Sequence, residues 1–387
     1  MNDNFAPLKL KQLVNLIFSD QSGQSVLGIP KELFFSPKKI NPLKAELFDK
    51  PLATPFGVAA GPHSQLAQNI IAAWLCGARY IELKTVQTLD ELTISKPCID
   101  MQDEGYNCEW SQELKIEESF NEYLKAWILI HLLSHKLGFG NNPETIFNMS
   151  VGYNFEGICK DNVQWFLNKM NDCSAEKEAM VAELAKWYPE IKNIEIPSKI
   201  SDSITLSTMH GCPPEEIEKI GLYLIEEKKL HTFIKLNPTL LGPQELRRIL
   251  NEVHHHHTQV PDQAFEHDLK YDNAISIIKA LTQAAQKNKV FFGIKLTNTL
   301  ESMNNRNIFS AEEKMMYMSG KALHPISVNI ARKLQQDFSG QLKISFSGGA
   351  DCFNISQIIG CGIFPVTVSS DLLKPGGYGR LGQYSQN

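Results

Sequence analysis

The chain has 387 residues, of which 43% are hydrophobic and 21% charged, and its formal net charge is −5. This composition is typical of a globular protein, and it excludes a disordered chain, a collagen-like fibre and a small disulfide-stapled domain. Because the basic residues are scattered and the net charge is mildly negative, we expect no nucleic-acid partner.

The N-terminal residues lack the basic stretch and apolar run of a signal peptide, and no apolar run reaches membrane-spanning length. The eight cysteines form neither a Cys-x-x-Cys pair nor a Cys/His ligand spacing. We therefore expect reduced thiols, with no zinc or iron–sulfur cluster. The sequence predicts a cytoplasmic protein that does not associate with a membrane.

Eight short runs of apolar and β-branched residues predict strands, because each ends in small or polar residues and precedes a segment of helical period. The runs cover residues 53–60, 79–85, 145–151, 202–207, 232–237, 290–297, 342–347 and 364–369. Gly77 ends the first helical segment, and Pro213 and Pro325 open later ones. This alternation fits a closed (β/α)8 TIM barrel better than an open doubly wound sheet.

The barrel is expected to occupy residues 51–387. Residues 1–50 are predicted to form an N-terminal extension that packs on it. Two stretches, at about 86–144 and 155–201, are longer than a crossover needs and are predicted to be insertions. The first should carry a helix over 123–137, and the second is charged and helical in period, as expected on the barrel surface.

Polar residues follow the predicted strands at the end where a barrel carries its chemistry. Lysines, amides and hydroxyls inside otherwise apolar runs are costly to bury without partners, so they indicate a polar ligand. These residues are Lys84 and Thr85, Asn148, Ser150 and Asn154, the stretch 207–214, Lys235 and Asn237, Lys295 and 297–299, 347–349, and Ser369 and Ser370.

The last two strand ends favour a phosphate site. Gly348 and Gly349 follow the seventh predicted strand, and Ser369 and Ser370 follow the eighth. Barrels commonly bind phosphate at these two ends through backbone N–H groups, and serine hydroxyls can add donors. The alternative is that the glycines form a simple turn and the serines a simple strand end.

The inward lysines Lys84 and Lys235 admit three interpretations. One of them could form a Schiff base, as in an aldolase or lyase. Alternatively, they could provide the cation beside the pyrimidine half of a reduced flavin. The third interpretation is that the aliphatic part of each lysine side chain packs against the protein while its ammonium group reaches solvent.

Two residues of the stretch after the fourth strand could move a proton. Cys212 lies just before a predicted helix start, where the dipole favours a thiolate, or it is a small buried turn residue. His210 is a second candidate, or a structural histidine. The internal tract 254–257, four histidines, is either a metal tract or a solvated loop.

Longer strings resemble the flavin-binding barrel of dihydroorotate and dihydropyrimidine dehydrogenases. The similarity runs from about Pro51 to Tyr384 and is greatest to the N-terminal barrel of large proteins described as selenate reductase subunits. The strings that carry it are AAGPHSQLAQN (59–69), LKTVQ (83–87), FNMSVGYN (147–154), STMHGCPP (207–214) and KLTNTL (295–300).

The resemblance implies the cofactor FMN and residues that contact it and a heterocyclic substrate. The implied FMN contacts are Ala60, Gly61, Lys84, Thr85, Lys235, Thr297, Gly320, Gly348, Gly349, Ser369 and Ser370. The implied substrate contacts are Asn107, Glu109, Asn298 and Thr299, to which the strand-end positions add Asn148 and Asn154. Lys84 would stabilise charge on both flavin and ring.

The chain departs from this family's pattern at the fourth strand, which typically reads Asn-x-Ser-Cys-Pro. Here Thr205 stands at the asparagine position, and Thr208 follows Ser207 where the family has cysteine. Cys212, four residues further on, is the preferred acid/base, with the hydroxyl of Thr208 as the alternative. The changed contact also suggests a substrate other than orotate.

The resemblance implies an oxidoreductase of pyrimidine or purine metabolism that transfers hydride between FMN and a CH–CH or C=C bond of a cyclic amide. No Gly-x-Gly-x-x-Gly fingerprint or cluster-binding cysteine motif is present. Electrons are therefore expected from a separate NAD(P)H/FAD/iron–sulfur subunit or a diffusible carrier, and family members often form homodimers. The alternatives are a lysine-dependent aldolase or lyase, and a non-catalytic barrel subunit of a redox complex.

Overall fold

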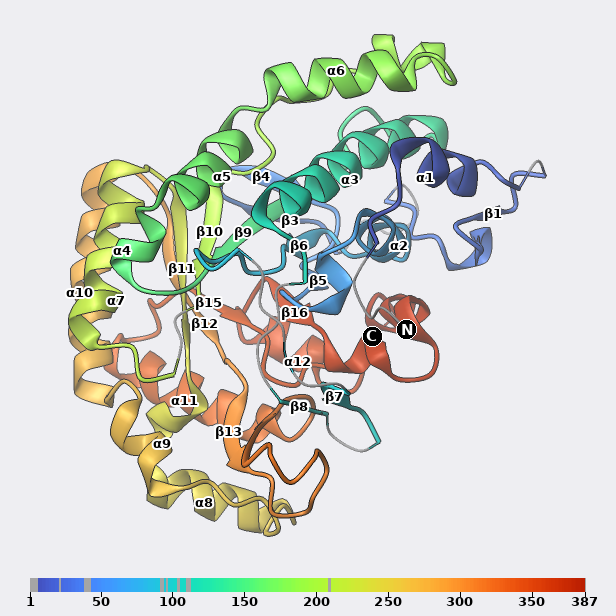
Figure 1. The fold of residues 1–387 in the computed structure, drawn as a ribbon. Helices are drawn as coiled ribbons and strands as arrows, with labels where there is room; N and C mark the ends of the chain where they lie inside the picture. The colour runs from blue at the N-terminus through green and yellow to red at the C-terminus, as the bar shows by residue number, and fades with distance from the viewer. Residues whose placement is uncertain are drawn as a thin grey trace.

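The computed structural model describes residues 6–20, 22–37, 43–90, 94, 97–102, 105–108, 113–207 and 210–386. Eight parallel strands close into a barrel in chain order, so that the last strand pairs with the first (Figure 1). They are β5 (Phe56–Val58), β6 (Tyr80–Glu82), β9 (Ile146–Val151), β10 (Ser203–Leu206), β11 (His231–Leu236), β12 (Phe292–Leu296), β15 (Ile344–Phe346) and β16 (Val366–Val368). Each overlaps one predicted run, and the (β/α)8 barrel is confirmed.

Helices surround the barrel and connect its strands. They are α2 (Ala67–Leu75), α3 (Ile116–Lys136), α4 (Phe155–Ile158), α5 (Asp161–Asn171), α6 (Ser174–Leu184), α7 (Pro214–Leu222), α8 (Pro243–Glu252), α9 (Asp262–His267), α10 (Tyr271–Asn288), α11 (Leu323–Asp337), α12 (Ile355–Gly360) and α13 (Leu381–Tyr384). Within the described ranges, none combines the length and apolar character needed to span a bilayer.

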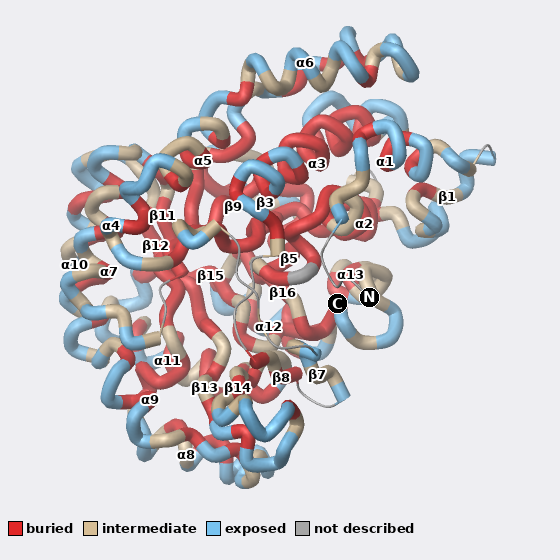
Figure 2. Tube along the Cα trace, in the orientation of Figure 1, coloured by how far each residue is buried: buried red, intermediate tan, exposed pale blue. Residues whose placement is uncertain are grey.

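The two stretches predicted as insertions differ in burial. Helix α3 begins seven residues before the predicted helix. Its first turn is charged and so adds no apolar periodicity, but Glu118 in that turn accepts a hydrogen bond from the backbone N–H of Lys115 at 2.9 Å. Most of α3 is buried against α2 and α5 (Figure 2). Helix α6 projects from the body, and of its residues only Leu184 is buried.

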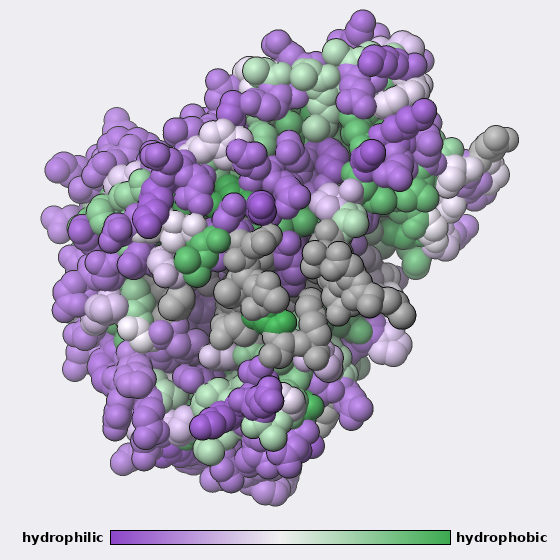
Figure 3. Space-filling view, in the orientation of Figure 1, coloured by the Kyte–Doolittle hydropathy of each residue, from purple (hydrophilic) through white to green (hydrophobic). Residues whose placement is uncertain are grey.

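Apolar side chains are concentrated inside the molecule rather than on the face shown in Figure 3. Hydrophilic side chains dominate that face, including the surface over α8, α9 and α10. The buried residues line the strands and the inner faces of the helices (Figure 2). This is the layer arrangement expected when helices cover a closed parallel sheet.

The N-terminal region includes helix α1 (Leu10–Ile17) and the two hairpins β1 (Ser25–Val26)–β2 (Ile29–Pro30) and β3 (Ala45–Leu47)–β4 (Lys50–Leu52). The two turn residues of the β3–β4 hairpin, Phe48 and Asp49, have φ of +55° and +57°, as in a type I′ turn. Phe48 stacks on His231 with ring centroids 4.7 Å apart and meets Phe291 edge-on at 5.1 Å. The hairpin therefore plugs the amino end of the barrel, and the predicted boundary at residues 50/51 falls inside it.

A small antiparallel sheet follows the carboxyl end of the barrel, where no sheet is expected from the sequence. Its order is β13 (Leu300–Met303), β14 (Met315–Met318), β8 (Tyr106–Asn107), β7 (Ile99–Asp100). It joins the segment after β6 to the segment after β12, and Asn107 pairs with Tyr317. The sheet thus places residues 97–102 and 105–108 beside the barrel mouth.

Replacing Phe48 by alanine tests the plug. The ring is buried and packs on three aromatic rings, so the substitution is expected to lower the free energy of unfolding by about 3–5 kcal/mol. Urea denaturation measures the loss. The matched control is Phe353→Ala, since Phe353 is 77% exposed and its truncation should change stability by about 0.5 kcal/mol or less. Equal effects of the two substitutions would contradict the assignment of the hairpin as a plug.

Candidate active site

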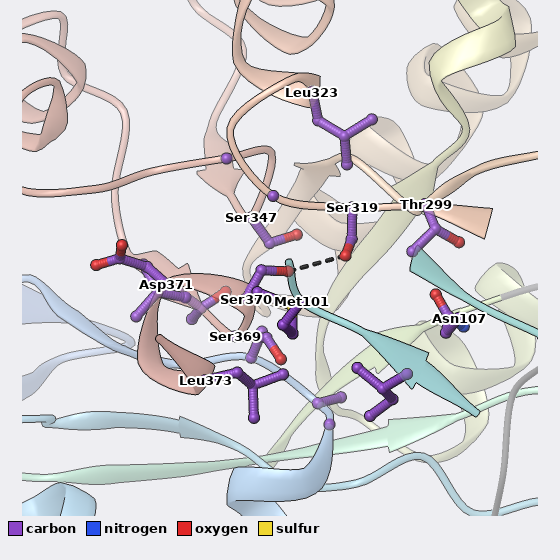
Figure 4. Close-up of a pocket in the computed structure, with 18 of the residues that line it drawn as sticks. Met101, Asn107, Thr299, Ser319, Leu323, Ser347, Ser369, Ser370, Asp371 and Leu373 are labelled. Atoms are coloured by element: carbon purple, nitrogen blue, oxygen red, sulfur yellow. Dashed lines mark hydrogen bonds between the residues drawn. The ribbon is translucent and has the colours of Figure 1, made fainter. Parts of the chain in front are cut away.

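A cavity of about 260 Å³ lies at the carboxyl ends of the barrel strands. Its wall combines strand ends with residues from the β7–β8 segment and the loops after β14, β15 and β16 (Figure 4). Many of the sequence-predicted residues line it: Ala60, Gly61, Lys84, Asn107, Lys235, Thr297, Thr299, Gly320, Gly349, Ser369 and Ser370. The fold therefore brings together residues that are up to about 310 positions apart in the sequence.

One end of the cavity is built from glycine backbone and serine hydroxyls. Gly320 and Gly349 have φ of +81° and +80°, and a Cβ on Gly349 would lie 2.3 Å from the carbonyl oxygen of Gly320. The hydroxyls of Ser319 and Ser370 are 2.8 Å apart (Figure 4). Helix α11 begins three residues after Gly320. A helix N-terminus, close backbone and hydroxyl donors are the groups that bind a phosphate.

Contacts with His63 and with the C-terminal segment fix the turn that carries these serines. His63 Nε2 lies 3.0 Å from the carbonyl oxygen of Ser369. Asp371 accepts two hydrogen bonds from Arg380, at 3.0 and 2.8 Å, and one from the Tyr384 hydroxyl at 2.5 Å. The C-terminal segment thus holds the turn in place.

The opposite end of the cavity carries amide and hydroxyl groups. Asn107 and Thr299 lie there together, on the side away from Asp371 (Figure 4). Asn107 comes from β8 and Thr299 from the segment between β12 and β13, so the small sheet positions both. An amide and a hydroxyl supply both donors and acceptors for a polar ligand.

Lys84 and Lys235, together with Lys321 and Lys374, form the cationic part of the cavity wall. Burial lowers the pKa of Lys84, and nearby Glu113 and Cys98 offset part of that shift. Burial also lowers the pKa of Lys235, to about 8, against the opposing effect of Glu82. This value leaves most Lys235 side chains protonated at pH 7, so the wall presents positive charge to a ligand.

Several predicted residues lie beside the cavity and contact protein groups. The Thr85 hydroxyl is 2.8 Å from the Ser150 hydroxyl. Asn148, inside the barrel, donates to Thr205 Oγ1 at 2.8 Å. A Cβ on Gly348 would lie 2.0 Å from Ser327 Oγ, so this glycine permits close packing on α11.

Two further asparagines have structural partners. Asn154 caps α4 by accepting a hydrogen bond from the Gly157 N–H at 2.8 Å. Asn298 donates to Asn237 Oδ1 at 2.8 Å and accepts from the Ser207 hydroxyl at 3.4 Å. Neither residue lines the cavity. The predicted residues Glu109 and Thr208 lie outside the described residues.

Cys212 lines a smaller neighbouring cavity with Lys235, Asn237 and Asp268 rather than the main one. Burial raises the pKa of its thiol to about 11, and Glu216 adds to the shift. At this pKa the side chain is a neutral thiol at pH 7.

His210, on the same loop, has a carboxylate partner. Its Nδ1 lies 3.1 Å from both oxygens of the buried Asp268, which also accepts from the Thr239 hydroxyl at 2.5 Å and the Gly211 N–H at 3.2 Å. Burial acts to raise the pKa of Asp268, but these hydrogen bonds outweigh it and lower the pKa. A carboxylate only accepts, so the Nδ1 of His210 carries a proton and Nε2 is the basic nitrogen.

The cavity also contains residues that the sequence did not single out, among them Gln65, Cys98 and Glu113. Cys98 and Glu113 belong to the segment between β6 and α3, where no periodic pattern indicates structure. Only the pairing of β8 with β14 reveals that this segment lines the cavity. Among the described residues, no group of three His, Cys, Asp or Glu side chains could hold a metal ion.

Comparisons with known proteins agree with this architecture. The family model described as "Oxidoreductase YgfK, N-terminal TIM-barrel domain" matches residues 27–387. The proteins named oxidoreductase YgfK from Escherichia coli K12 and from Escherichia coli O157:H7 are each 44% identical over 402 residues. These matches cover 98% of this chain and 39% of each relative, so the chain spans well under half of their length.

A solved structure, ligand-free DHODH from Eimeria tenella, aligns with a TM-score of 0.55 over 97% of this chain and 92% of that chain, at 14% identity. At this identity the likeness concerns the fold. The match of the family model to most of the sequence, together with the 44% identity to both relatives, shows that the chain belongs to the family of the N-terminal TIM-barrel domain of oxidoreductase YgfK.

Proposed function

We propose that the chain is an FMN-dependent oxidoreductase barrel acting on a CH–CH or C=C bond of a pyrimidine- or purine-like cyclic amide. One observation carries the proposal: a single cavity has a phosphate-type cradle at one end and the buried lysines Lys84 and Lys235 in its wall. FMN combines a phosphate with a ring whose pyrimidine half gains negative charge on reduction. The names of the family and of the relatives also support an oxidoreductase.

The residues present fit FMN. Gly320, Gly349, Ser369 and Ser370 would hold the phosphate, because the two glycines allow the backbone a close approach and the two serines add hydroxyl donors. Ala60, Gly61 and Thr297 would lie along the ring system, where small side chains leave room. Lys84 and Lys235 would stabilise negative charge on it. Bound FMN would supply hydride transfer, which the side chains of this chain cannot.

Substrate recognition is proposed for the opposite end of the cavity. Asn107 and Thr299 would pair with the amide edge of a heterocycle, which presents alternating donors and acceptors. Glu109 is proposed as a further contact from its sequence position. Asn298 would act through Asn237, and Asn148 through Thr205, because their amides already contact these groups. Thr85, Gly348 and Asn154 would support the site through packing and capping.

We place proton transfer on the loop after β10 and assign it to His210. Asp268 orients the imidazole, whose ring centroid is 5.6 Å from that of Tyr317, the strand partner of the cavity residue Asn107. Cys212, predicted from the sequence, lines the smaller cavity and is a neutral thiol. His210 lines neither of these two cavities, so its support is the Asp268 carboxylate and the nearby ring of Tyr317. An imidazole can both accept and donate a proton, which suits this role.

Electrons are proposed to come from a separate NAD(P)H/FAD/iron–sulfur component. The support is that the curated relatives are much longer than the region matched, since the chain covers 39% of each. A homodimer is a further proposal, carried over from the resemblance. The competing aldolase or lyase chemistry predicts a lysine adduct when substrate is trapped with borohydride, whereas the flavin proposal predicts none.

Retention of FMN is the first test. The protein, supplied with excess FMN and passed over a desalting column, should keep a yellow chromophore. Gly349→Ala should raise the dissociation constant at least about tenfold, because the new Cβ would lie 2.3 Å from the Gly320 carbonyl oxygen. Fluorescence titration with FMN measures the change.

The control for this variant is Gly242→Ala. Gly242 also has a positive φ, +90°, but a Cβ there would meet nothing within 4 Å. The control therefore reproduces the backbone strain without the steric contact. Unchanged affinity in both variants would remove the phosphate cradle from the proposal, and failure of the unmodified protein to retain FMN would end it.

The assignment of proton transfer is tested by comparing His210→Asn with Cys212→Ala. With a cyclic amide that bleaches bound FMN anaerobically, His210→Asn should slow single-turnover flavin reduction by about 10²–10⁴-fold. Cys212→Ala should stay within a few-fold of the unmodified protein. Stopped-flow absorbance gives both rates, and the reverse pattern would return the role to Cys212.

A further inference from the structure

The interior of this barrel is unusually polar. Inward-facing positions of a (β/α)8 barrel are mostly filled by branched apolar side chains. Here the buried residues Glu82 on β6, Thr205 on β10, Lys295 on β12, Ser345 on β15 and Thr367 on β16 are all polar. Glu82 and Lys295 are both completely buried. Such a core is costly unless its groups satisfy one another, so the arrangement requires an explanation.

Two of the interior lysines are direct neighbours. Lys235 on β11 and Lys295 on β12 are register partners in the parallel ladder, so their side chains emerge on the same side. Lys235 reaches the wall of the main cavity, and Lys295 stays wholly buried. Like charges placed directly across from each other repel, and burial strengthens the repulsion.

Glu82 supplies the opposite charge. Its carboxylate forms an ion pair with Lys295. Lys295 Nζ also donates to Thr367 Oγ1 at 2.8 Å and to Ser345 Oγ at 3.3 Å. Thr367 itself lines the main cavity. The ion pair therefore lies directly behind the cavity wall, connected to it through Thr367 and through the strand partner Lys235.

We propose that Glu82 is an internal counter-ion that keeps the paired ammonium groups of Lys235 and Lys295 together, so that Lys235 presents a positive charge to the ligand. Glu82 is a positioning residue, because it acts on the ligand through Lys235. One part of this inference rests on the proposed function, namely that the ligand beside Lys235 gains negative charge. The internal counter-ion itself does not depend on that function.

The effects of the charged groups around Lys235 on its pKa are consistent with this role of Glu82. Burial lowers the pKa of Lys235 to about 8; Glu82 opposes the shift, while Lys295 and Lys84 add to it. Burial also lowers the pKa of Lys295, and Glu82 again opposes the shift. Tyr80 faces the same carboxylate, and burial followed by Glu82 raises the pKa of its hydroxyl. Glu113 and Cys98 face Lys84.

Removal of Glu82 should therefore lower the pKa of Lys235 further, so that its charge is lost as pH rises through neutrality. Removal of Lys295 should do the opposite, because Glu82 would then face Lys235 without its present partner. Removal of both takes away one negative and one positive charge and should leave Lys235 close to its original state. These three expected directions of the Lys235 pKa shift distinguish a counter-ion from a residue that only fills space.

The test measures the titration of Lys235 in the protein without added FMN. Competitive labelling with acetic anhydride at a series of pH values, read by mass spectrometry, gives the midpoint for this lysine. Glu82→Gln should lower the midpoint by about one pH unit or more, and Lys295→Met should raise it. The double variant Glu82→Gln/Lys295→Met should return it to near the original value.

The matched control is Glu122→Gln. Glu122 forms another buried ion pair, with Lys125 on α3, outside the barrel interior. This control should leave the Lys235 midpoint unchanged. Should Glu82→Gln fail to fold, the opposite shift in Lys295→Met and the restored midpoint in the double variant still test the proposal. The same Lys235 midpoint in the unmodified protein, in Glu82→Gln and in Lys295→Met would overturn it.

A second measurement links the counter-ion to the ligand. In the FMN-loaded protein, Glu82→Gln should shift the flavin reduction potential to a more negative value at pH 8, and the double variant should reverse the shift. If the protein retains no FMN but the labelling midpoints move as expected, the proposed function fails while the counter-ion stands. If FMN binds and the midpoints do not move, the counter-ion fails and the proposed function stands.

Discussion

Closure of the eight strands is the constraint on which the site depends. A closed parallel sheet forces all eight carboxyl ends into one ring, so residues far apart in sequence become neighbours. A Cβ on Gly61, after β5, would lie 3.0 Å from the hydroxyl of Ser369, after β16. Ser319 and Ser370 meet only because β14 leads into α11 beside the end of β16. Without closure, neither the glycine cradle nor the lysine wall would exist as a site.

The barrel could be predicted from the sequence because its strands and helices leave periodic patterns. The small sheet could not, because β7 and β8 have two residues each and so short a segment carries no measurable alternation. Sequence also indicated which strand ends are polar, but not where each side chain points. Asn154 and Asn298 have the residue type of a substrate contact, yet the first caps a helix and the second contacts Asn237. The adjacent glycines also differ: Gly348 packs on Ser327 and does not line the cavity, while Gly349 lines it and packs on the backbone of Gly320.

Burial decides which group on the loop after β10 is suited to proton transfer. A thiol at a helix start is a reasonable candidate from sequence, since the helix dipole lowers its pKa. In this fold burial acts in the opposite direction and raises the pKa of the Cys212 thiol to about 11. His210 differs because its Nδ1 is paired with the carboxylate of Asp268, which orients the ring. The distinction requires the position of Asp268, which is 58 residues away in the sequence.

The charge environment of the interior lysines also bears on the choice between flavin and Schiff-base chemistry. A Schiff-base lysine must lose its proton to attack a carbonyl, and neighbouring cations or an apolar pocket promote that loss. Lys84 and Lys295 act in this direction on Lys235, but the carboxylate of Glu82 acts against it. An enzyme that needed a neutral amine would gain nothing from a buried carboxylate in this position. A site that must stabilise a developing anion benefits from it directly, because the carboxylate keeps the nearby ammonium charged while remaining behind the cavity wall.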